Sequence, residues 1–239
     1  MKNPHVTILQ TSFAKRDDTI VFLKEKVPGV KVEFITDSTI LADVRANGGP
    51  TKAVYDRMKL YAKAAEISGA DLIVNSCSTV GEVADEYRKE VSIPVMKIED
   101  PMCREAAKLG TKFAIFGTVE TSMGPVARII ERLVAERGEK AECKLFVQNA
   151  AWDALVAGRP EEHNRILLEN IRKLDEEGYD AIVMSQVSMR ALLPDLKDTK
   201  TPVLCSFFSG YQAIADKLNE IAAGKRRSVA AFKNKTKRR

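Results

Sequence analysis

The feature that most constrains the fold of this chain is an internal repeat. Residues 178–188 align without gaps with residues 69–79, at an offset of 109 positions. Two shorter matches flank this pair in the same order: residues 201–204 resemble residues 93–96, and residues 113–118 resemble residues 6–11, at offsets of 108 and 107. Three matches at nearly one offset predict two copies of a single structural unit.

The chain length and composition fit such a two-unit globular protein. A chain of 239 residues has room for one large domain or for two of about 110–120 residues. No apolar run approaches the ~18 residues of a membrane helix, and the first residues lack the apolar stretch of a signal peptide. The four cysteines and two histidines show no metal or disulfide spacing. We therefore expect a cytoplasmic protein with no membrane segment and no metal site.

The net charge of +5 comes from one end of the chain. Residues 225–239 hold eight Lys or Arg and no acid, which leaves 38 − 8 = 30 bases against 33 acids in the other 224 residues. We expect residues 224–239 to be a basic, disordered tail, because such composition is typical of solvated chain ends. We expect no specific nucleic-acid partner.

Strand and helix patterns alternate through both units. In the first, strands are expected at 5–10, 30–36, 72–74 and 93–98, with helices at 16–27, 51–68 and 80–91. In the second, strands are expected at 112–117, 143–147, immediately before 186, and at 202–206. The helices there are expected at 122–137, 149–157, 160–177 and 188–197, and a last one at about 209–223.

This alternation predicts an α/β fold of two similar lobes, each a parallel sheet flanked by helices. Lobe one covers residues 1–99, with residues 206–223 packing back on it, and lobe two covers residues 100–205. Ligands of such sheets bind at the carboxyl ends of the strands, so we expect the active site in the cleft between the lobes. The connection 37–50 is long, and we expect it to be a mobile lid in which Arg45 meets an anion or simply faces solvent.

Cys77 is the candidate catalytic residue. It follows the apolar run 72–74 within a polar turn, and a helical pattern begins at Val80. Ser78 or Thr79 is expected to cap that helix, whose N-terminus would lower the pKa of the thiol and attract carboxylates. At the repeat offset, the residue that corresponds to Cys77 is Gln186, so the two are expected on opposite walls of one cleft.

Three motifs together resemble the aspartate/glutamate/hydantoin racemase superfamily over nearly the whole body of the chain. They are the strand-Cys-Ser-Thr motif at 77–79, the Gly-Thr-x-x-Thr turn at 117–121 and the two-copy layout. The resemblance implies two α/β lobes, no cofactor, and one cysteine per lobe on opposite faces of a substrate carbon next to a carboxylate. Cys77 matches the first of these cysteines. The chain departs from the family at Gln186, because an amide cannot shuttle a proton near neutral pH.

The remaining candidate residues are placed around the cleft. The resemblance assigns carboxylate binding to Ser78 and Thr79, and the second-lobe turn to Thr118 and Thr121. The full set of expected substrate-binding residues is Gln10, Thr11, Ser12, Asn75, Ser78, Thr79, Thr118, Thr121, Ser185, Gln186, Val187 and Ser188. Ser188 is also a candidate helix cap. Glu120 is either a base or a first-turn helix acid, Cys205 either faces the site or lies in the core, and Cys103 and Cys143 are expected to be structural.

The sequence therefore favours a cofactor-independent enzyme that acts on a small carboxylate through one cysteine. The chemistry left open is that of an isomerase, a decarboxylase or a lyase, with Cys77 as acid/base or as nucleophile. The alternatives are a true amino-acid or hydantoin racemase with an unrecognised second acid, and a non-catalytic carboxylate-binding protein. A homo-oligomer is compatible with the sequence.

Overall fold

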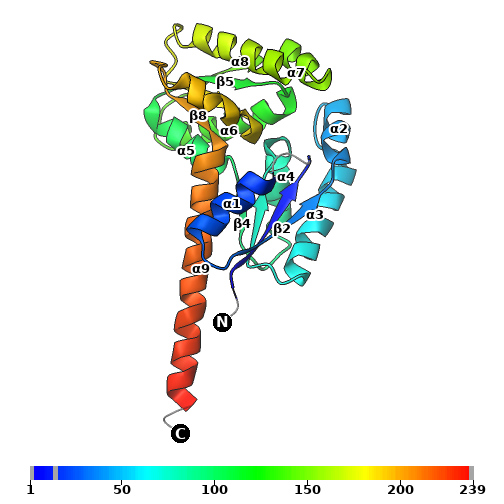
Figure 1. Ribbon diagram of the computed structural model, residues 1–239, viewed down its shortest axis with the longest axis vertical. Coiled ribbons are helices and arrows are strands. Elements are labelled where there is room, and N and C mark those ends of the chain that lie inside the picture. Colours follow the sequence, from blue (N-terminus) through cyan, green and yellow to red (C-terminus); the bar gives the residue numbers. More distant parts are fainter. Residues whose placement is uncertain (1–2, 13–15, 237–239) are drawn as a thin grey trace.

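The computed structural model describes residues 3–12 and 16–236, and it contains two four-stranded parallel sheets (Figure 1). The order is β2-β1-β3-β4 in the first sheet and β6-β5-β7-β8 in the second, so the two sheets have equivalent topologies. The predicted fold class is thereby confirmed. The strands are β1 His5–Gln10, β2 Lys31–Thr36, β3 Leu72–Asn75, β4 Val95–Lys97, β5 Lys112–Gly117, β6 Glu142–Val147, β7 Ala181–Met184 and β8 Val203–Cys205.

Helices cover both faces of each sheet. In lobe one they are α1 Arg16–Lys26, α2 Thr39–Ala46, α3 Lys52–Ile67, the 3₁₀ helix η1 Ser78–Val80 and α4 Gly81–Tyr87. In lobe two they are α5 Asp100–Leu109, α6 Glu120–Ala135, α7 Asn149–Val156, α8 Pro160–Leu174 and the 3₁₀ helix η2 Val187–Leu196. The last helix, α9, runs over Ser206–Thr236.

The central strands are apolar because both of their faces are buried. In β3, Leu72 and Val74 belong to one hydrophobic cluster and Ile73 belongs to another, as the alternation of side chains along a strand requires. The same division occurs in β7, where Ile182 and Met184 share the cluster of Leu72. One apolar cluster therefore contains side chains of both lobes and joins them.

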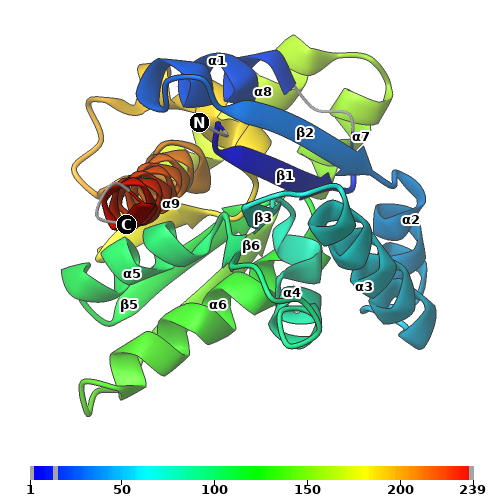
Figure 2. The ribbon, with the colours of Figure 1, turned by 90° about the horizontal axis from the view of Figure 1, so that it is seen from below.

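Helix α9 lies between the lobes. It packs against α1 on one side and α5 on the other (Figure 2). Phe207, Tyr211, Ile214 and Leu218 are buried in the cluster that the two lobes share. Helix α9, the last element of the fold, thus packs into the interface between the two lobes.

The fold differs from the sequence-based prediction in three respects. Helix α9 continues through Thr236 and extends away from both lobes (Figure 1), whereas the sequence-based prediction ended the last helix near residue 223. The stretch has no proline and is rich in Ala, Lys and Arg, which are strong helix formers. The expectation for residues 237–239, and for the side chains of 225–236, lies outside the described part of the chain.

The second and third differences concern the segments after the central strands and the expected lid. Residues 80–91 do not form one helix: η1 precedes α4, and α4 ends in a tightened turn in which the amides of Lys89 and Glu90 bond three residues back. Residues 187–196 form a 3₁₀ helix that contains Pro194, which has no amide hydrogen to donate. The expected lid at 37–50 contains helix α2.

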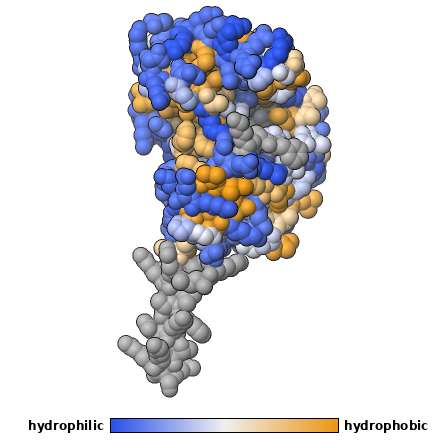
Figure 3. Space-filling view, viewed as in Figure 1, coloured by the Kyte–Doolittle hydropathy of each residue, from blue (hydrophilic) through white to orange (hydrophobic). Residues whose placement is uncertain are grey.

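The surface is mixed in polarity. The face seen in Figure 3 is mainly hydrophilic and carries separate hydrophobic areas, and the exposed large apolar side chains include Val21 and Phe208. Within residues 3–12 and 16–236, none of the helices combines the length and the hydropathy that a membrane span requires.

Candidate active site

A cavity of about 130 Å³ lies where the carboxyl ends of strands from both lobes meet. A cavity of roughly 150 Å³ holds benzene, so this one suits a molecule of about six heavy atoms. Its lining consists of Gln10, Thr11, Ser12, Thr19, Leu41, Ser76, Cys77, Ser78, Thr79, Val119, Ser122, Ser185, Gln186, Val187, Ser188, Arg190, Phe207 and Tyr211.

Cys77 enters the cavity from the turn between β3 and η1. The turn is held from two sides: Asn75 Nδ2 donates to Cys77 O at 2.9 Å, and both the amide and the hydroxyl of Ser76 donate to Leu9 O at 3.1 Å. Asn75 is completely buried and therefore positions the turn from behind instead of lining the cavity.

The surroundings of the Cys77 sulfur both raise and lower the pKa of its thiol. Burial raises the pKa of the Cys77 thiol, and hydrogen bonds from Thr11 and Thr79 oppose this effect. The charge of Glu99 raises the pKa slightly further. The expected lowering of the pKa is therefore wrong, because desolvation outweighs the hydrogen bonds to the sulfur. The resting form at neutral pH is the thiol, and the hydroxyl and amide donors are in place for a thiolate when it forms.

Gln186 lines the cavity from lobe two in a fixed orientation. The amide nitrogen and the hydroxyl of Thr118 both lie close to Gln186 Oε1, at 2.7 and 3.0 Å. Because a backbone N–H can only donate, the atom it meets must be the amide oxygen. Gln186 therefore keeps its oxygen against Thr118 and has its NH₂ group available to the cavity.

Arg190 is the one formally charged residue among the described lining residues. It pairs with Asp18 of α1 and lies over the ring of Phe207, with 4.2 Å between Cζ and the ring centroid. Its side chain is only 13% exposed, whereas that of Asp18 is 50% exposed. Arg190 is thus the cationic group of the lining, and Asp18 shares its charge.

The structure brings most of the expected site residues together. Cys77 and nine of the expected binding residues line the cavity: Gln10, Thr11, Ser12, Ser78, Thr79, Ser185, Gln186, Val187 and Ser188. Asn75, Thr118 and Thr121 do not line it. Asn75 bonds to Cys77, and Thr118 bonds to Gln186. Thr121 Oγ1 is buried without a hydrogen-bond partner among the described residues. Ser188 lies inside η2, so its expected role as a helix cap is wrong, and Gln186 precedes that helix.

Eight lining residues were not expected from the sequence: Thr19, Leu41, Ser76, Val119, Ser122, Arg190, Phe207 and Tyr211. Arg190 lies four residues after Gln186. It could have been predicted by treating every residue of the segment after β7 as a possible lining residue. Phe207 and Tyr211 carry no such signal, because α9 reaches the cavity only through its packing between the lobes. Cys205 does not line the cavity among the described residues; its thiol points to the carbonyl oxygens of Gln186 and Val187 at 3.9 Å.

A buried acid lies behind the Cys77 turn. Glu99 is completely buried, and its carboxyl oxygens have no hydrogen-bond partner among the described residues. A Cβ atom at Gly81 would lie 2.3 Å from Glu99 Oε1, so only glycine lets the carboxyl approach the start of α4. Burial raises the pKa of Glu99 to about 7.

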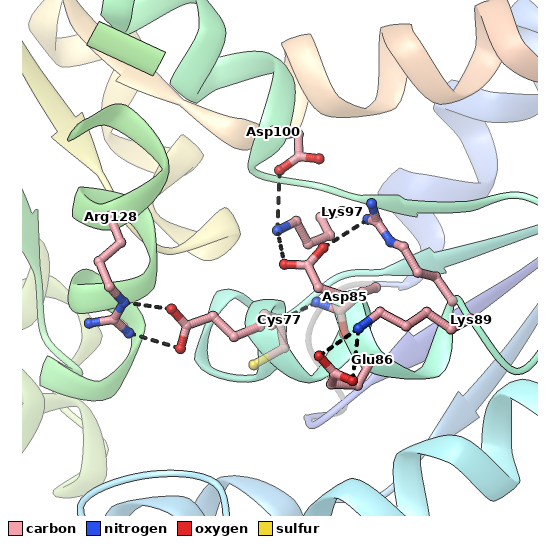
Figure 4. A network of polar contacts seen from close by, with 10 residues as sticks. Cys77, Asp85, Glu86, Lys89, Lys97, Asp100 and Arg128 are labelled. Carbon is pink, nitrogen blue, oxygen red and sulfur yellow. Dashed lines mark hydrogen bonds and ion pairs between the residues drawn. The ribbon is translucent and has the colours of Figure 1, made fainter. Parts of the chain in front are cut away.

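Ion pairs surround this region (Figure 4). Lys97 Nζ lies 2.9 Å from Asp85 and 3.6 Å from Asp100, and Arg128 of α6 makes two hydrogen bonds to Glu82 of α4, at 2.5 and 3.0 Å. The second pair joins lobe two to the helix that follows Cys77.

Comparisons with known proteins agree with this fold. A family model described as Asp/Glu/Hydantoin racemase matches residues 24–214. A structure of a putative Asp/Glu racemase from Yersinia pestis superposes with a TM-score of 0.67 at 20% identity, covering 90% of this chain and 99% of that chain. Glutamate racemase from Aquifex pyrophilus gives 0.62 at 17% identity (89% and 83% covered), and Picrophilus torridus aspartate racemase gives 0.67 at 14% identity (90% and 94% covered). At these identities the structural matches support the fold.

Proposed function

Because the chain belongs to the Asp/Glu/Hydantoin racemase family, we propose that it transfers a proton on one face only of the carbon next to a carboxylate, through Cys77. The observation that carries this proposal is the asymmetry of the cavity. Lobe one contributes the Cys77 thiol with hydroxyl and amide donors around it, and lobe two contributes the amide of Gln186, which Thr118 holds. An amide can hold a substrate oxygen, but it cannot exchange a proton near neutral pH.

The charges and the protonation state of the cavity agree with this chemistry. A small acid is attracted by Arg190, and the NH₂ of Gln186 offers donors to its carboxylate. The protonated resting thiol is suited to deliver a proton to a carbanion, and the thiolate left behind is stabilised by Thr11 and Thr79. In the reverse direction the thiolate takes the proton, and the C–H electron pair moves into the carboxylate as an enediolate. Decarboxylation, carbon–carbon cleavage and one-sided isomerisation all use this step.

The test is solvent-deuterium exchange. Small carboxylic acids, including both enantiomers of aspartate and glutamate, are incubated with the protein in deuterated water and followed by NMR and chiral chromatography. We expect deuterium to enter next to the carboxylate while the handedness stays unchanged. Cys77→Ala should abolish the exchange, and Cys143→Ala, which removes a thiol outside the cavity, should leave it intact. Efficient racemisation by the unmodified protein would overturn the single-cysteine mechanism.

A second variant examines the missing partner. Gln186→Cys restores a thiol to the opposite wall and should permit slow racemisation. We expect the rate to be low, because the surroundings of residue 186 are built for an amide and a misplacement of ~1 Å can cost about a hundredfold.

A further inference from the structure

Glu99 is a buried acid that lies outside the cavity. It is placed between β4 and α5 and is completely buried, and neither carboxyl oxygen has a hydrogen-bond partner on another described residue. A buried carboxylate without donors is costly, so burial raises the pKa of Glu99 to about 7. The charge of this side chain therefore changes close to neutral pH.

The Glu99 carboxyl lies next to the turn that carries Cys77. A Cβ atom added at Gly81 would lie 2.3 Å from Glu99 Oε1, so the carboxyl is in contact with the first residue of α4. The amide of Val80 donates to Cys77 O at 3.1 Å, so Gly81 follows Cys77 after a single turn of 3₁₀ helix. Two groups that each carry a proton, the thiol and the carboxyl, are therefore held at the two ends of one short turn.

The charged groups around Glu99 are already paired with one another (Figure 4). They are Lys97 with Asp85 and Asp100, and nearer the surface Arg88 with Asp85 and Arg128 with Glu82. The Lys97 side chain is 5% exposed, and its Nζ lies 2.9 Å from Asp85 and 3.6 Å from Asp100. Two carboxylates thus share this buried ammonium group, so ionisation of Glu99 adds a charge that has no cation of its own.

The charge of an ionised Glu99 acts on neutral groups nearby. These are the Cys77 thiol, the Tyr87 phenol and the Cys103 thiol, and the charge raises the pKa of each. Where α9 approaches this region, its residues 206–210 carry no acid or base. Among these three neutral groups, Cys77 is the one that lines the cavity. Because like charges repel strongly where water is excluded, an ionised Glu99 disfavours the Cys77 thiolate.

We propose that Glu99 is a positioning residue that acts through Cys77: the Cys77 thiolate forms readily only while the Glu99 carboxyl holds its proton. This inference rests on the proposed function, because it concerns the thiolate that takes a proton from the substrate. Below pH 7 the carboxyl is neutral and the thiolate meets no added repulsion. As the pH rises through 7 the carboxyl ionises, so the thiolate gains less from the rising pH than it would beside a neutral group.

Alkylation of Cys77 by iodoacetamide measures the thiolate without any substrate. Below its pKa an isolated thiol gains tenfold in thiolate per pH unit, so its rate rises about a thousandfold between pH 5.5 and pH 8.5. For Cys77 we expect a rise about threefold smaller, because Glu99 ionises within this range. Cys143 of lobe two is the reference in the same sample and should show the full rise, since its pKa is about 12. Peptide mapping by mass spectrometry gives both rates.

The variant Glu99→Gln keeps the side chain close to its neutral shape. Cys77 should react at equal rates in the variant and the unmodified protein at pH 5.5, and about threefold faster in the variant at pH 8.5. A merely structural role of Glu99 would change the rate by the same factor at both pH values. The matched control is Glu86→Gln, which removes an exposed acid of α4 paired with Lys89 and should leave both rates unchanged.

The outcomes separate this role from the proposed function. A variant-to-unmodified ratio that is the same at both pH values, whether one or another number, overturns the role of Glu99. If Glu99→Gln does not fold, the unmodified protein still decides, because an equal rise for Cys77 and Cys143 overturns the role. Failure of the proposed function has a different signature: no acid exchanges deuterium, whereas the alkylation ratio still changes with pH. The coupling between the thiol and the carboxyl then stands, and the reaction assigned to Cys77 is overturned.

Discussion

At the scale of single residues, burial and hydrogen bonding oppose each other at Cys77. Desolvation raises the pKa of its thiol, and the hydrogen bonds from Thr11 and Thr79 limit the rise. A proton donor needs such a balance, because the thiol must stay protonated at rest and still form a thiolate during the reaction. The two threonines are thus expected to tune the chemistry without exchanging protons themselves.

The first prediction concerns the alkylation of Cys77. At pH 7 it should react with iodoacetamide more slowly than free cysteine, because burial raises the pKa of its thiol, and the rate should rise with pH. Thr11→Val removes a donor to the thiolate and should slow the reaction about fivefold at pH 8. Peptide mapping by mass spectrometry after brief treatment gives the rate at each cysteine.

The other cysteines serve as internal references for this measurement. Cys103 is completely buried with a pKa held well above its usual range, and burial raises the pKa of Cys143 to about 12. Both should react later than Cys77. An unchanged rate in Thr11→Val, or faster labelling of Cys143, contradicts the described environment of the thiol.

The second prediction concerns Glu99. Burial raises its pKa to about 7 from the usual 4.5, so between these pH values the folded protein holds a proton that the unfolded chain has lost. The stabilisation is present below pH 4.5 and is lost as the pH rises through 7, a fall of about 3 kcal/mol in the free energy of unfolding. Urea unfolding at pH 5 and pH 8 should show this fall in the unmodified protein and not in Glu99→Gln. Glu105→Gln changes an exposed acid of helix α5, which begins directly after Glu99, and this variant should retain the fall.

At the scale of elements, the first turns of α9 depend on a close approach to lobe one. A Cβ at Gly210 would lie 2.5 Å from the carbonyl oxygen of Ile98, and this backbone atom cannot rotate away. Glycine therefore allows α9 to come near enough for Phe207 and Tyr211 to reach the cavity.

The third prediction compares two glycines of this helix. Gly210→Ala should lower the free energy of unfolding by about 1–3 kcal/mol, because α9 must shift away from Ile98. Gly224→Ala meets no atom within 4 Å and should raise it by about 0.5–1 kcal/mol, because alanine favours the helix. Urea denaturation measures both. Equal effects of the two substitutions would mean that α9 does not contact Ile98 as described.

Much of the fold follows from patterns that are local in the sequence. The apolar run at 72–74 and its repeat partner predict the central strands, and the repeat predicts the two matching sheets. The bounds of the elements after these strands depend on longer-range packing, so the 3₁₀ geometry of η1 and η2 was missed. Most of the cavity wall could be predicted because the carboxyl ends of parallel strands meet there. The rise in the pKa of the Cys77 thiol could not be predicted, because the burial that causes it depends on groups far apart in the chain.

At the scale of the whole molecule, the lobes are joined by one shared apolar cluster and by charged contacts at their rims. The cluster includes Val6 and Leu72 from lobe one and Phe116 and Met184 from lobe two. The charged contacts are Asp18 with Arg190, Glu82 with Arg128, and Arg45 of α2, whose guanidinium lies 4.2 Å from the ring centroid of Trp152 in α7. The pair of Glu82 and Arg128 is about half exposed, so it contributes at most about 1 kcal/mol, and the cluster dominates.

The fourth prediction follows from this shared cluster. The two lobes should unfold in a single transition despite their separate sheets. Trp152 is the sole tryptophan and reports on lobe two, whereas far-ultraviolet circular dichroism reports on both lobes. Both signals should give one urea midpoint. Arg128→Met should move both midpoints together by a small amount. A tryptophan transition separated from the dichroism transition contradicts a common core.

The contribution of α9 to the cavity has a consequence for the order of events during synthesis. Both lobes leave the ribosome before α9, and units early in a chain generally begin to fold first. Until Phe207 and Tyr211 emerge, the wall they provide is missing and the Cys77 turn has water on that side. The nascent chain therefore passes through a period in which the cavity that holds the Cys77 thiol lacks one part of its wall. The length of that period is the time needed to translate the segment from β8 to the first turns of α9.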